Sequence, residues 1–379
     1  MRIGIEAKVL TSRTSGIGRY AINLVRSLLM ALPEKDHTLD IVLFTGPQTA
    51  RSVLDTLSGS YSEHFCALQS SLLRSLVSLP CSIVHHNIDV FHGLDHVGLP
   101  LFFKRGRYVI TVHDVIPLLF PQLFTLKHRL IVHAGLARVA QQADMVIVPS
   151  YAVQQDVQQY LRIDKSRVVV IPEGCEPRFR PLTDPEHLHR VRTKYGLPAL
   201  YILCLGTLEP RKNITTLLHA FARLRSLLHG EPALHLVVAG ARGWREQAIF
   251  QTVKNLGIEQ AVCFPGFIDD EDLPALYSGA LLFVFPSLYE GFGLPVLEAM
   301  SCGIPVVASN TSAMPEVAGD AALLVDPYDI EGMATAIATV VHNTSLRDSL
   351  RRKGLIQAQR FSWETTARKT LDLYMALGR

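Results

Sequence analysis

The stretch 286-PSLYEGFGLPVLEAMSCGIPVV-307 places two carboxylates, Glu290 and Glu298, eight positions apart around a glycine-rich turn. The apolar run 280-ALLFVFP-286 leads into it and is typical of a buried strand, whereas 295-PVLEAM-300 begins a helix with Pro295 in its first turn. The two carboxylates therefore bracket a strand-to-helix turn. Its glycines allow the backbone to approach a ligand closely.

The same strand-then-helix order recurs along the chain, with amphipathic stretches such as 17–32 and 214–228 between short apolar runs. Apolar strands that alternate with helices predict parallel sheets buried on both faces. The strand candidates are 2–7, 39–45, 107–114, 143–150 and 167–172 in the first half, and 200–207, 234–240, 261–266, 280–286, 305–310 and 322–327 in the second.

The length of 379 residues exceeds one ordinary hydrophobic core. The strand-helix pattern runs twice, and a polar, proline-containing stretch separates the two runs. The sequence therefore predicts two doubly wound α/β domains, 1–172 and 200–361, joined by a linker at 173–199. Ligands bind beyond the carboxyl ends of the strands in such sheets, so we expect the active site in a cleft between the domains.

Composition indicates a globular protein, with 48% hydrophobic and 19% charged residues. The six cysteines form no C-x-x-C pair, which favours reduced thiols. The sequence from Met1 enters a strand without an export-type apolar segment, and no apolar run approaches the ~20 residues that span a bilayer. We therefore expect a cytoplasmic protein.

The net charge of +3 is unevenly distributed, because residues 1–172 carry 17 Lys and Arg against 12 Asp and Glu. This excess is too weak for nucleic-acid binding, which usually shows a dense basic stripe. It is compatible with a first half that contacts anionic lipid or a phosphorylated acceptor, and also with an ordinary solvated surface.

Two loops carry candidate phosphate contacts. Arg211 and Lys212 lie in 206-GTLEPRKN-213, where a strand candidate gives way to a helix, and two cations beside free helix N–H groups suit a diphosphate. Solvated surface cations are the alternative. The turn 14-TSGIGRY-20 lacks the full G-x-G-x-x-G spacing, so it predicts a turn that accommodates phosphate and not a dinucleotide fingerprint.

Two other groups of polar residues have a structural interpretation beside a functional one. His113 and Asp114 end the strand candidate 107–114 and form either a hydrogen-bonded structural pair or a functional one. The acidic run 269-DDED-272 precedes a helical pattern, which favours helix capping over a metal site. No dense set of metal ligands, no G-x-S-x-G and no P-loop motif is present, so we expect no protein-bound metal.

Several blocks together closely resemble the retaining glycosyltransferases of family 4, which have the GT-B fold. They lie in one order along nearly the whole chain: 14-TSGIGRY-20, 113-HDVIPLLFP-121, 171-IPEGCEPRF-179, 206-GTLEPRKN-213, 262-VCFPGFIDDEDLPALYSGA-280, 286-PSLYEGFGLPVLEAMSCGIPVVAS-309 and 315-PEVAGDAALLVDP-327. The resemblance implies two Rossmann-like domains that face each other across a cleft. It also implies a final helix, 362–379, that returns to the first domain.

The resemblance gives the two carboxylates different roles: Glu298 on the ribose hydroxyls of a nucleotide sugar, and Glu290 on the hydroxyls of the donor sugar. Lys212 matches the diphosphate lysine. Family members often carry arginine where this chain has Thr207, and Arg211 is the candidate replacement. The resemblance implies four catalytic residues, which are His113, Arg211, Lys212 and Glu290. Beside Glu298, the residues implied in donor binding are Gly16, Gly18, Thr207, Phe267, Ile268, Gly291, Phe292, Gly293 and Leu294.

The implied reaction is transfer of a sugar to a saccharide or lipid-linked acceptor without a metal or other cofactor. Front-side attack by the acceptor is the family's accepted route to retention. The blocks look most like bacterial mannosyltransferases of O-antigen assembly, so GDP-mannose is the expected donor. UDP- or dTDP-sugars remain alternatives. A nucleotide-sugar epimerase or phosphorylase on the same architecture, and a catalytically silent binding subunit, are the other classes to test.

Overall fold

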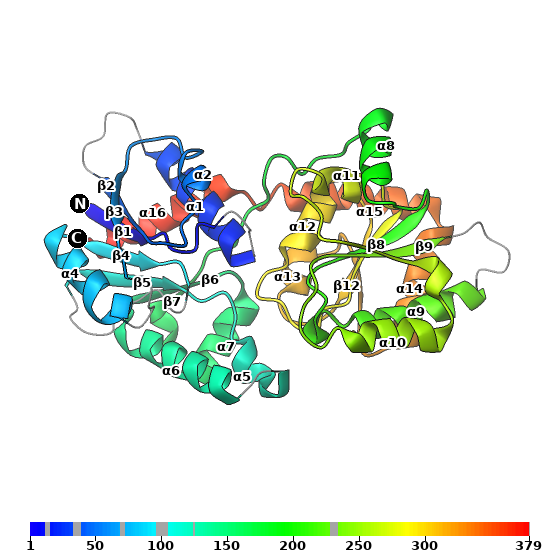
Figure 1. The fold of residues 1–379 in the computed structure, drawn as a ribbon, viewed down its shortest axis with the longest axis horizontal. Helices are drawn as coiled ribbons and strands as arrows, with labels where there is room; N and C mark the ends of the chain where they lie inside the picture. The colour runs from blue at the N-terminus through cyan, green and yellow to red at the C-terminus, as the bar shows by residue number, and fades with distance from the viewer. Residues whose placement is uncertain are drawn as a thin grey trace. The chain divides into compact units, whose positions relative to one another are not determined.

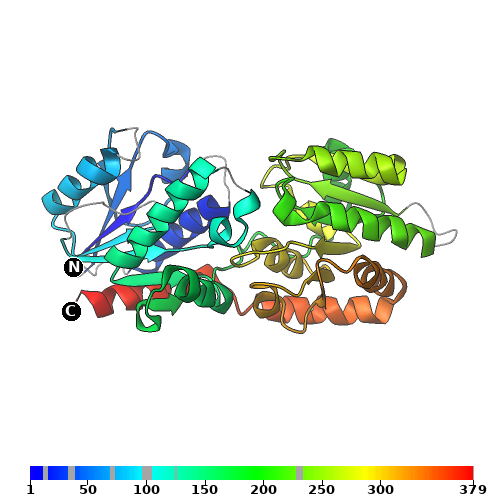
Figure 2. The same cartoon turned by 90° about the horizontal axis from the view of Figure 1, so that it is seen from below.

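The computed structural model describes residues 1–11, 16–32, 39–68, 73–95, 105–123, 126–227 and 234–378. The chain divides into two compact units, Met1–Gly174 with Ser362–Arg379, and Cys175–Phe361. Each unit is built on one parallel sheet, and helices cover both faces of each sheet (Figures 1 and 2). The predicted α/β fold with two doubly wound sheets is confirmed.

The first unit contains a seven-stranded sheet in the order β3-β2-β1-β4-β5-β6-β7, with every neighbouring pair parallel. Its strands are β1 (Arg2–Glu6), β2 (Asp40–Thr45), β3 (Ser62–Phe65), β4 (Val90–Gly93), β5 (Arg107–Thr111), β6 (Met145–Val148) and β7 (Val168–Val170). Its helices and helical turns are α1 (Gly16–Ala31), α2 (Arg51–Leu54), η1 (Arg74–Ser78), α4 (Leu79–His85), α5 (Ile116–Leu119), η2 (Pro121–Leu123), α6 (Leu126–Gln142), α7 (Tyr151–Leu161), η3 (Lys165–Arg167) and α16 (Trp363–Leu377).

The second unit contains a six-stranded parallel sheet in the order β10-β9-β8-β11-β12-β13. Its strands are β8 (Tyr201–Leu205), β9 (His235–Ala239), β10 (Val262–Gly266), β11 (Leu282–Phe285), β12 (Val306–Ser309) and β13 (Leu323–Val325). Its helices and turns are α8 (Pro185–Lys194), η4 (Pro210–Lys212), α9 (Ile214–Leu227), α10 (Gln247–Leu256), η5 (Glu259–Ala261), α11 (Leu273–Ser278), α12 (Leu294–Ser301), α13 (Met314–Ala318), α14 (Ile330–His342) and α15 (Thr344–Ala358).

Successive side chains of the central strand β8 enter opposite sides of the second sheet. Tyr201 and Leu203 belong to one buried cluster, whereas Ile202 and Cys204 belong to the other. Because a strand with apolar residues on both faces needs cover on both, the continuous apolar run explains the three-layered packing. In the parts of the chain that the structure describes, no helix has the length and apolar character needed to cross a bilayer.

All eleven strand candidates form strands, but two further strands lack a sequence signal. The edge strand β3 consists of Ser-Glu-His-Phe and is largely exposed, so it shows no apolar run. The strand β4 has four residues including His92, yet it lies buried between β1 and β5. His92 is accommodated there because both of its ring nitrogens have hydrogen-bond partners.

Most of the stretch expected as a linker, 173–199, lies inside the second unit. Residues 185–194 form α8, which packs against α11. Asp184 caps this helix, its side chain accepting a hydrogen bond from the Glu186 backbone N–H at 3.1 Å. The polar composition that suggested a linker is therefore the composition of a capped surface helix.

The C-terminal helix α16 belongs to the first unit and packs along α1 (Figure 1). Ser362 caps its start, accepting from the Thr365 backbone N–H at 3.1 Å. Tyr374 is fully buried, and its hydroxyl lies 2.5 Å from His92 Nδ1 on β4. The Thr366 hydroxyl donates to the Pro172 carbonyl at 2.7 Å.

The chain passes between the units twice, at Gly174–Cys175 and at Phe361–Ser362. In the first unit a Cβ at Gly174 would collide with the backbone of Trp363, so only glycine allows this approach. In the second unit the Cys175 N–H donates to the Phe361 carbonyl at 3.1 Å. The two crossing segments therefore run side by side.

We predict that Tyr374→Ala lowers the free energy of unfolding of the first unit by about 3–5 kcal/mol, because it opens a cavity beside α1 and orphans His92. Urea unfolding followed through Trp363, in a Trp244→Phe background, measures this unit. Met375→Ala on the same helix is the control, since Met375 is 40% exposed and should cost about 1 kcal/mol or less. Equal effects of the two substitutions would contradict this packing.

Candidate active site

The second sheet reverses its strand order between β8 and β11, which are neighbours although β9 and β10 intervene in the sequence. The loops that follow these two strands both begin at the carboxyl edge of the sheet. Crevices at such a reversal are where doubly wound sheets bind ligands. One loop carries Arg211 and Lys212, and the other carries Glu290.

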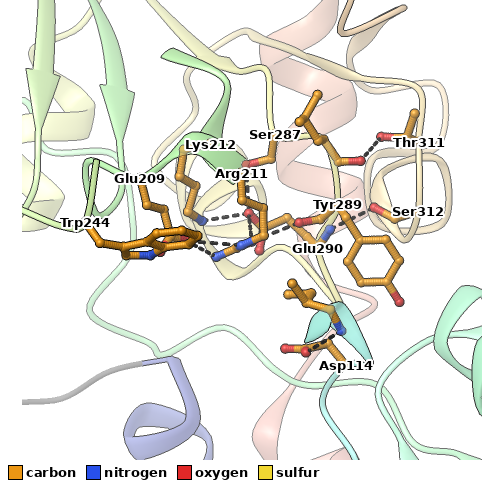
Figure 3. Close-up of polar contacts among 12 residues, drawn as sticks. Asp114, Glu209, Arg211, Lys212, Trp244, Ser287, Tyr289, Glu290, Thr311 and Ser312 are labelled. Atoms are coloured by element: carbon orange, nitrogen blue, oxygen red, sulfur yellow. Dashed lines mark hydrogen bonds and ion pairs between the residues drawn. The ribbon is translucent and has the colours of Figure 1, made fainter. Parts of the chain in front are cut away.

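Glu290 Oε1 collects three donors (Figure 3). Lys212 Nζ lies 2.6 Å away, the Ser287 hydroxyl 2.7 Å and Arg211 Nη1 2.8 Å. The side chains of Arg211, Lys212 and Glu290 are all at most 16% exposed. The structure thus brings together three of the four residues predicted to be catalytic. It also adds Ser287, a contact that the sequence analysis did not identify.

The two loops are held together by backbone and side-chain bonds. Asn213 adopts a left-handed conformation (φ 55°) at the end of η4, and its Nδ2 donates to the carbonyls of Pro286 and Pro327 at 3.2 and 2.7 Å. The Leu288 N–H donates to the Arg211 carbonyl at 2.9 Å. The positions of the cations relative to Glu290 are therefore fixed by the loops.

The charges in this cluster shift each other's titration. Burial acts to raise the pKa of Glu290, but the charges of Arg211 and Lys212 outweigh it and lower that pKa to about 2. Burial lowers the pKa of Lys212 despite the opposing charge of Glu290. At neutral pH Glu290 is therefore a carboxylate paired with cations, which suits acceptance of hydrogen bonds and not donation of a proton.

Arg211 is clamped from the side opposite Glu290. Its Nε and Nη2 donate to Glu209 Oε1 at 3.1 and 2.7 Å, and its Nη1 donates to the Tyr289 carbonyl at 2.8 Å. The Trp244 indole N–H donates to Glu209 Oε2 at 3.1 Å (Figure 3). Sequence reasoning missed both Glu209 and Trp244. A carboxylate two residues before the arginine was a usable signal for Glu209, but nothing in the sequence connects Trp244 to it.

Glu298 lies on α12, beyond the glycine turn that follows Glu290. Gly293 has a φ of 112°, and a Cβ there would collide with Met314, so this turn requires glycine. Glu298 is buried, and its Oε2 accepts from the Tyr277 hydroxyl at 2.9 Å. Tyr277 is a further contact that sequence reasoning missed.

The remaining donor-binding candidates of the second unit lie around these loops. Gly291 and Phe292 belong to the turn between Glu290 and α12, and Leu294 begins that helix. Phe292 is buried and packs edge-on against Phe361. Three others follow strand ends at the same edge of the sheet: Thr207 after β8 is exposed, Phe267 after β10 is 58% exposed, and Ile268 is buried.

Three candidates lie in the first unit. Gly16 and Gly18 occupy the first turn of α1, and residues 12–15 of the preceding turn lie outside the described residues. His113 follows β5 and is buried. Its Nε2 lies 3.0 Å from the Leu94 carbonyl, and its Nδ1 lies 3.3 Å from Glu173 Oε1. The partner of His113 is thus Glu173 and not the adjacent Asp114, whose Oδ1 accepts from the Ile116 N–H.

The acidic run 269–272 is held by a cation, and helix capping was the wrong explanation for it. Lys194 Nζ contacts Asp269 Oδ2 at 2.8 Å and Asp272 Oδ2 at 2.6 Å, and the Tyr195 hydroxyl also donates to Asp272. Asp272 occupies the N-cap position of α11 without a side-chain cap bond. Among the described residues, no group of three or more His, Cys, Asp and Glu side chains is arranged to hold a metal ion.

Comparison with known proteins identifies the class. Residues 14–179 match the family model "Glycosyltransferase Family 4", and residues 190–356 match "Glycosyl transferases group 1". The chain is 31% identical over 396 residues to the O-antigen chain mannosyltransferase B of Escherichia coli, and the match covers 100% of both chains. It therefore belongs to glycosyltransferase family 4 and is a hexosyltransferase.

Another relative is a longer protein that matches this chain over most of the chain's length. The chain is 33% identical to the serotype-specific mannosyltransferase WbdA of Escherichia coli over 95% of its own length, but it spans only 44% of that protein. Two solved structures share the fold. Anabaena HepE, in complex with UDP and glucose, has a TM-score of 0.79 at 22% identity over 100% of both chains. Sucrose-phosphate synthase of Thermosynechococcus elongatus has a TM-score of 0.75 at 23% identity, over 99% of this chain and 98% of the other. The two-unit α/β architecture is that of GT-B glycosyltransferases.

We predict that Glu290→Gln destabilises the second unit in a pH-dependent way. The folded-state pKa of Glu290, about 2, lies below its ordinary 4.5, so its carboxylate stabilises the folded state above about pH 4.5 and this contribution disappears as the pH falls toward 2. The shift corresponds to about 3 kcal/mol at neutral pH.

Urea unfolding between pH 7 and pH 3, followed through Trp244 in a Trp363→Phe background, measures the effect. Glu331→Gln is the control, because Glu331 is 66% exposed in its pair with Arg223 and should change stability by less than about 1 kcal/mol. A Glu290→Gln deficit that stayed constant down to pH 3 would contradict the ionised cluster.

Proposed function

We propose that the protein transfers mannose from GDP-mannose to a saccharide or lipid-linked saccharide in surface polysaccharide synthesis, with retention of the anomeric configuration. The observation that carries the proposal is the convergence of Lys212 and Arg211 on Glu290 at the strand-order reversal of the second sheet. Two half-buried cations there suit a diphosphate, and an acceptor-only carboxylate beside them suits sugar hydroxyls. The choice of mannose is supported by the two Escherichia coli relatives, which are both named mannosyltransferases.

The proposed chemistry depends on the leaving group. As the glycosidic C–O bond to the β-phosphate breaks, negative charge develops on the departing nucleoside diphosphate, and Lys212 stabilises it electrostatically. Glu290 orients the donor sugar through its hydroxyls, and Glu298 binds the ribose diol. The acceptor hydroxyl attacks from the face that the diphosphate leaves, and a phosphate oxygen takes its proton.

Arg211 and Lys212 differ in what their hydrogen-bonding groups contact. The Nε–Nη2 edge of Arg211 faces Glu209, and its Nη1 faces Tyr289 and Glu290. Lys212 instead presents a single ammonium that rotates freely among acceptors. We therefore assign the diphosphate mainly to Lys212 and the orientation of Glu290 mainly to Arg211.

A metal ion is unnecessary in this scheme, because the cationic side chains supply the charge that a divalent cation supplies in other transferases.

The experiment that tests the function is an assay of free nucleoside diphosphate with GDP-mannose, UDP-glucose and dTDP-rhamnose, each with and without acceptor saccharides, in EDTA. We expect release from GDP-mannose only when acceptor is present. Release without acceptor, or release that requires added Mg²⁺ or Mn²⁺, would contradict the proposal. Conversion of the donor to its epimer would instead favour an epimerase.

Contact of the first unit with an anionic membrane is part of the proposal, since a lipid-linked acceptor would be presented there. Leu73, Val77 and Val84 lie on one face of the helical segment 73–85 and are 42–53% exposed, whereas Leu79 and Ile83 on the opposite face are buried. Arg105 contacts the end of this segment, donating to the carbonyl of Val84. The positive excess of residues 1–172 suits an anionic surface.

Co-sedimentation with phospholipid vesicles tests this contact. We expect binding to phosphatidylglycerol vesicles that weakens with salt and weakens further in Val77→Ser/Val84→Ser, with unchanged transfer to a water-soluble acceptor. Equal sedimentation of both proteins would contradict the membrane contact.

A further inference from the structure

The His113 side chain is enclosed by groups that can only accept hydrogen bonds from it. Its Nε2 lies 3.0 Å from the Leu94 carbonyl oxygen, and its Nδ1 lies 3.3 Å from Glu173 Oε1. A carbonyl has no proton to donate, and an ionised carboxylate has none either. His113 and Glu173 are both less than 9% exposed, so both contacts are largely shielded from water.

A neutral imidazole carries one N–H, so it would satisfy only one of these two acceptors and set a lone pair against the other. A buried mismatch of that kind costs as much as an unsatisfied polar group. An imidazolium donates to both acceptors at once and forms an ion pair with Glu173. With Glu173 as a carboxylate, the arrangement of the two acceptors therefore selects the doubly protonated ring.

The other groups around the ring agree with a cation. Tyr20 of α1 packs edge-on at 4.6 Å, and its hydroxyl is hydrogen-bonded to Thr111. Burial lowers the pKa of His113, but Glu173, the Leu94 carbonyl and Asp114 together outweigh it and leave that pKa raised. His92 on β4 stays neutral, since burial lowers its pKa to about 3.

Glu173 also lies where the chain leaves the first unit. It immediately precedes Gly174, which abuts the backbone of Trp363, and the preceding Pro172 accepts a hydrogen bond from Thr366 of α16. The carboxylate thus joins the carboxyl end of β5 to the first crossing segment, and Gly174 of that segment packs against the second. Nothing else in the mechanism proposed above uses this ion pair.

We propose that Glu173 is a positioning residue that holds His113 as a buried imidazolium, so that His113 serves sugar transfer as a fixed positive charge and not as a general base. The inference rests on the proposed function only where it concerns transfer. The charge state of the pair is independent of the donor and of the acceptor.

The first test is ¹⁵N NMR of the full-length protein labelled at histidine, without substrate. We expect imidazolium shifts for His113 at pH 7.5, assigned by their loss in His113→Asn, and neutral-ring shifts in Glu173→Gln. A neutral His113 with one unprotonated nitrogen in the wild-type protein would overturn the proposal. This result stands whether or not Glu173→Gln folds, and it is unaffected by any error in the assigned donor.

The second test is the pH profile of transfer. Since only the protonated ring is competent, activity should fall as the pH rises through the raised pKa of His113. Without Glu173, burial dominates, so this alkaline limb should move down by at least about one pH unit in Glu173→Gln, with a tenfold loss of kcat at pH 8. Donor KM should change less than kcat. Glu176→Gln is the matched control, because Glu176 pairs with Arg178 in the second unit. A limb at the same pH in all three proteins would also overturn the proposal.

Discussion

One oxygen atom, Glu290 Oε1, organises the site of the second unit by accepting from Lys212, Ser287 and Arg211. Two cations side by side in a half-buried loop repel each other, and each loses hydration. A carboxylate between them offsets part of both costs, but only if the loops after β8 and β11 begin at adjacent strands. The parallel order β10-β9-β8-β11-β12-β13 meets that condition.

The contacts of Arg211 with Glu209 enlarge the charged cluster around Glu290. Glu209 and Trp244 fix the guanidinium from the far side, so the cluster of Glu209, Arg211, Lys212 and Glu290 contains two positive and two negative charges. A cluster without net charge is stable in the absence of ligand. A bound diphosphate would compete with Glu290 for Lys212, whereas Arg211 would keep Glu209 as a partner. The two adjacent cations are therefore unequal in their freedom to change partners.

The first unit depends on a different kind of constraint. His92 on β4 has Tyr374 on one ring nitrogen and Thr111 on the other, and Thr111 also contacts the Tyr20 hydroxyl. This buried polar chain links α16, the sheet and α1, and it lies beside the pair His113–Glu173. Because each member is satisfied only by the others, the C-terminal helix has a specified place in the first unit and not merely an apolar one.

The sequence patterns predicted the strands and turns that carry a local signal. They missed the contacts between residues that are far apart in the sequence. The eleven apolar strands and the strand-to-helix turn at Gly293 carry local signals, as do the two adjacent cations Arg211 and Lys212 at a strand end. The partners Tyr277, Trp244 and Glu173 do not, because their roles arise from contacts across 21 or more positions of sequence. The short strand β4 does not either, because its place is set by pairing with β1 and β5. The segment 185–194 and the acidic run 269–272 were misinterpreted for a related reason. Polar residues of the two segments pair with one another, since Lys194 contacts Asp272. Composition alone cannot show such a contact.

Isothermal titration of GDP and GMP, with UDP and UMP in parallel, tests whether Lys212 beside Glu290 forms the diphosphate site. We expect the wild-type protein to bind its preferred diphosphate at least about tenfold more tightly than the matching monophosphate, a difference of about 1.4 kcal/mol. Lys212→Ala should remove most of this preference, whereas Lys353→Ala, which removes a surface cation paired with Asp320, should leave it intact. Equal affinity for the diphosphate and monophosphate in the wild-type protein, or an unchanged preference in Lys212→Ala, would show that the diphosphate binds elsewhere.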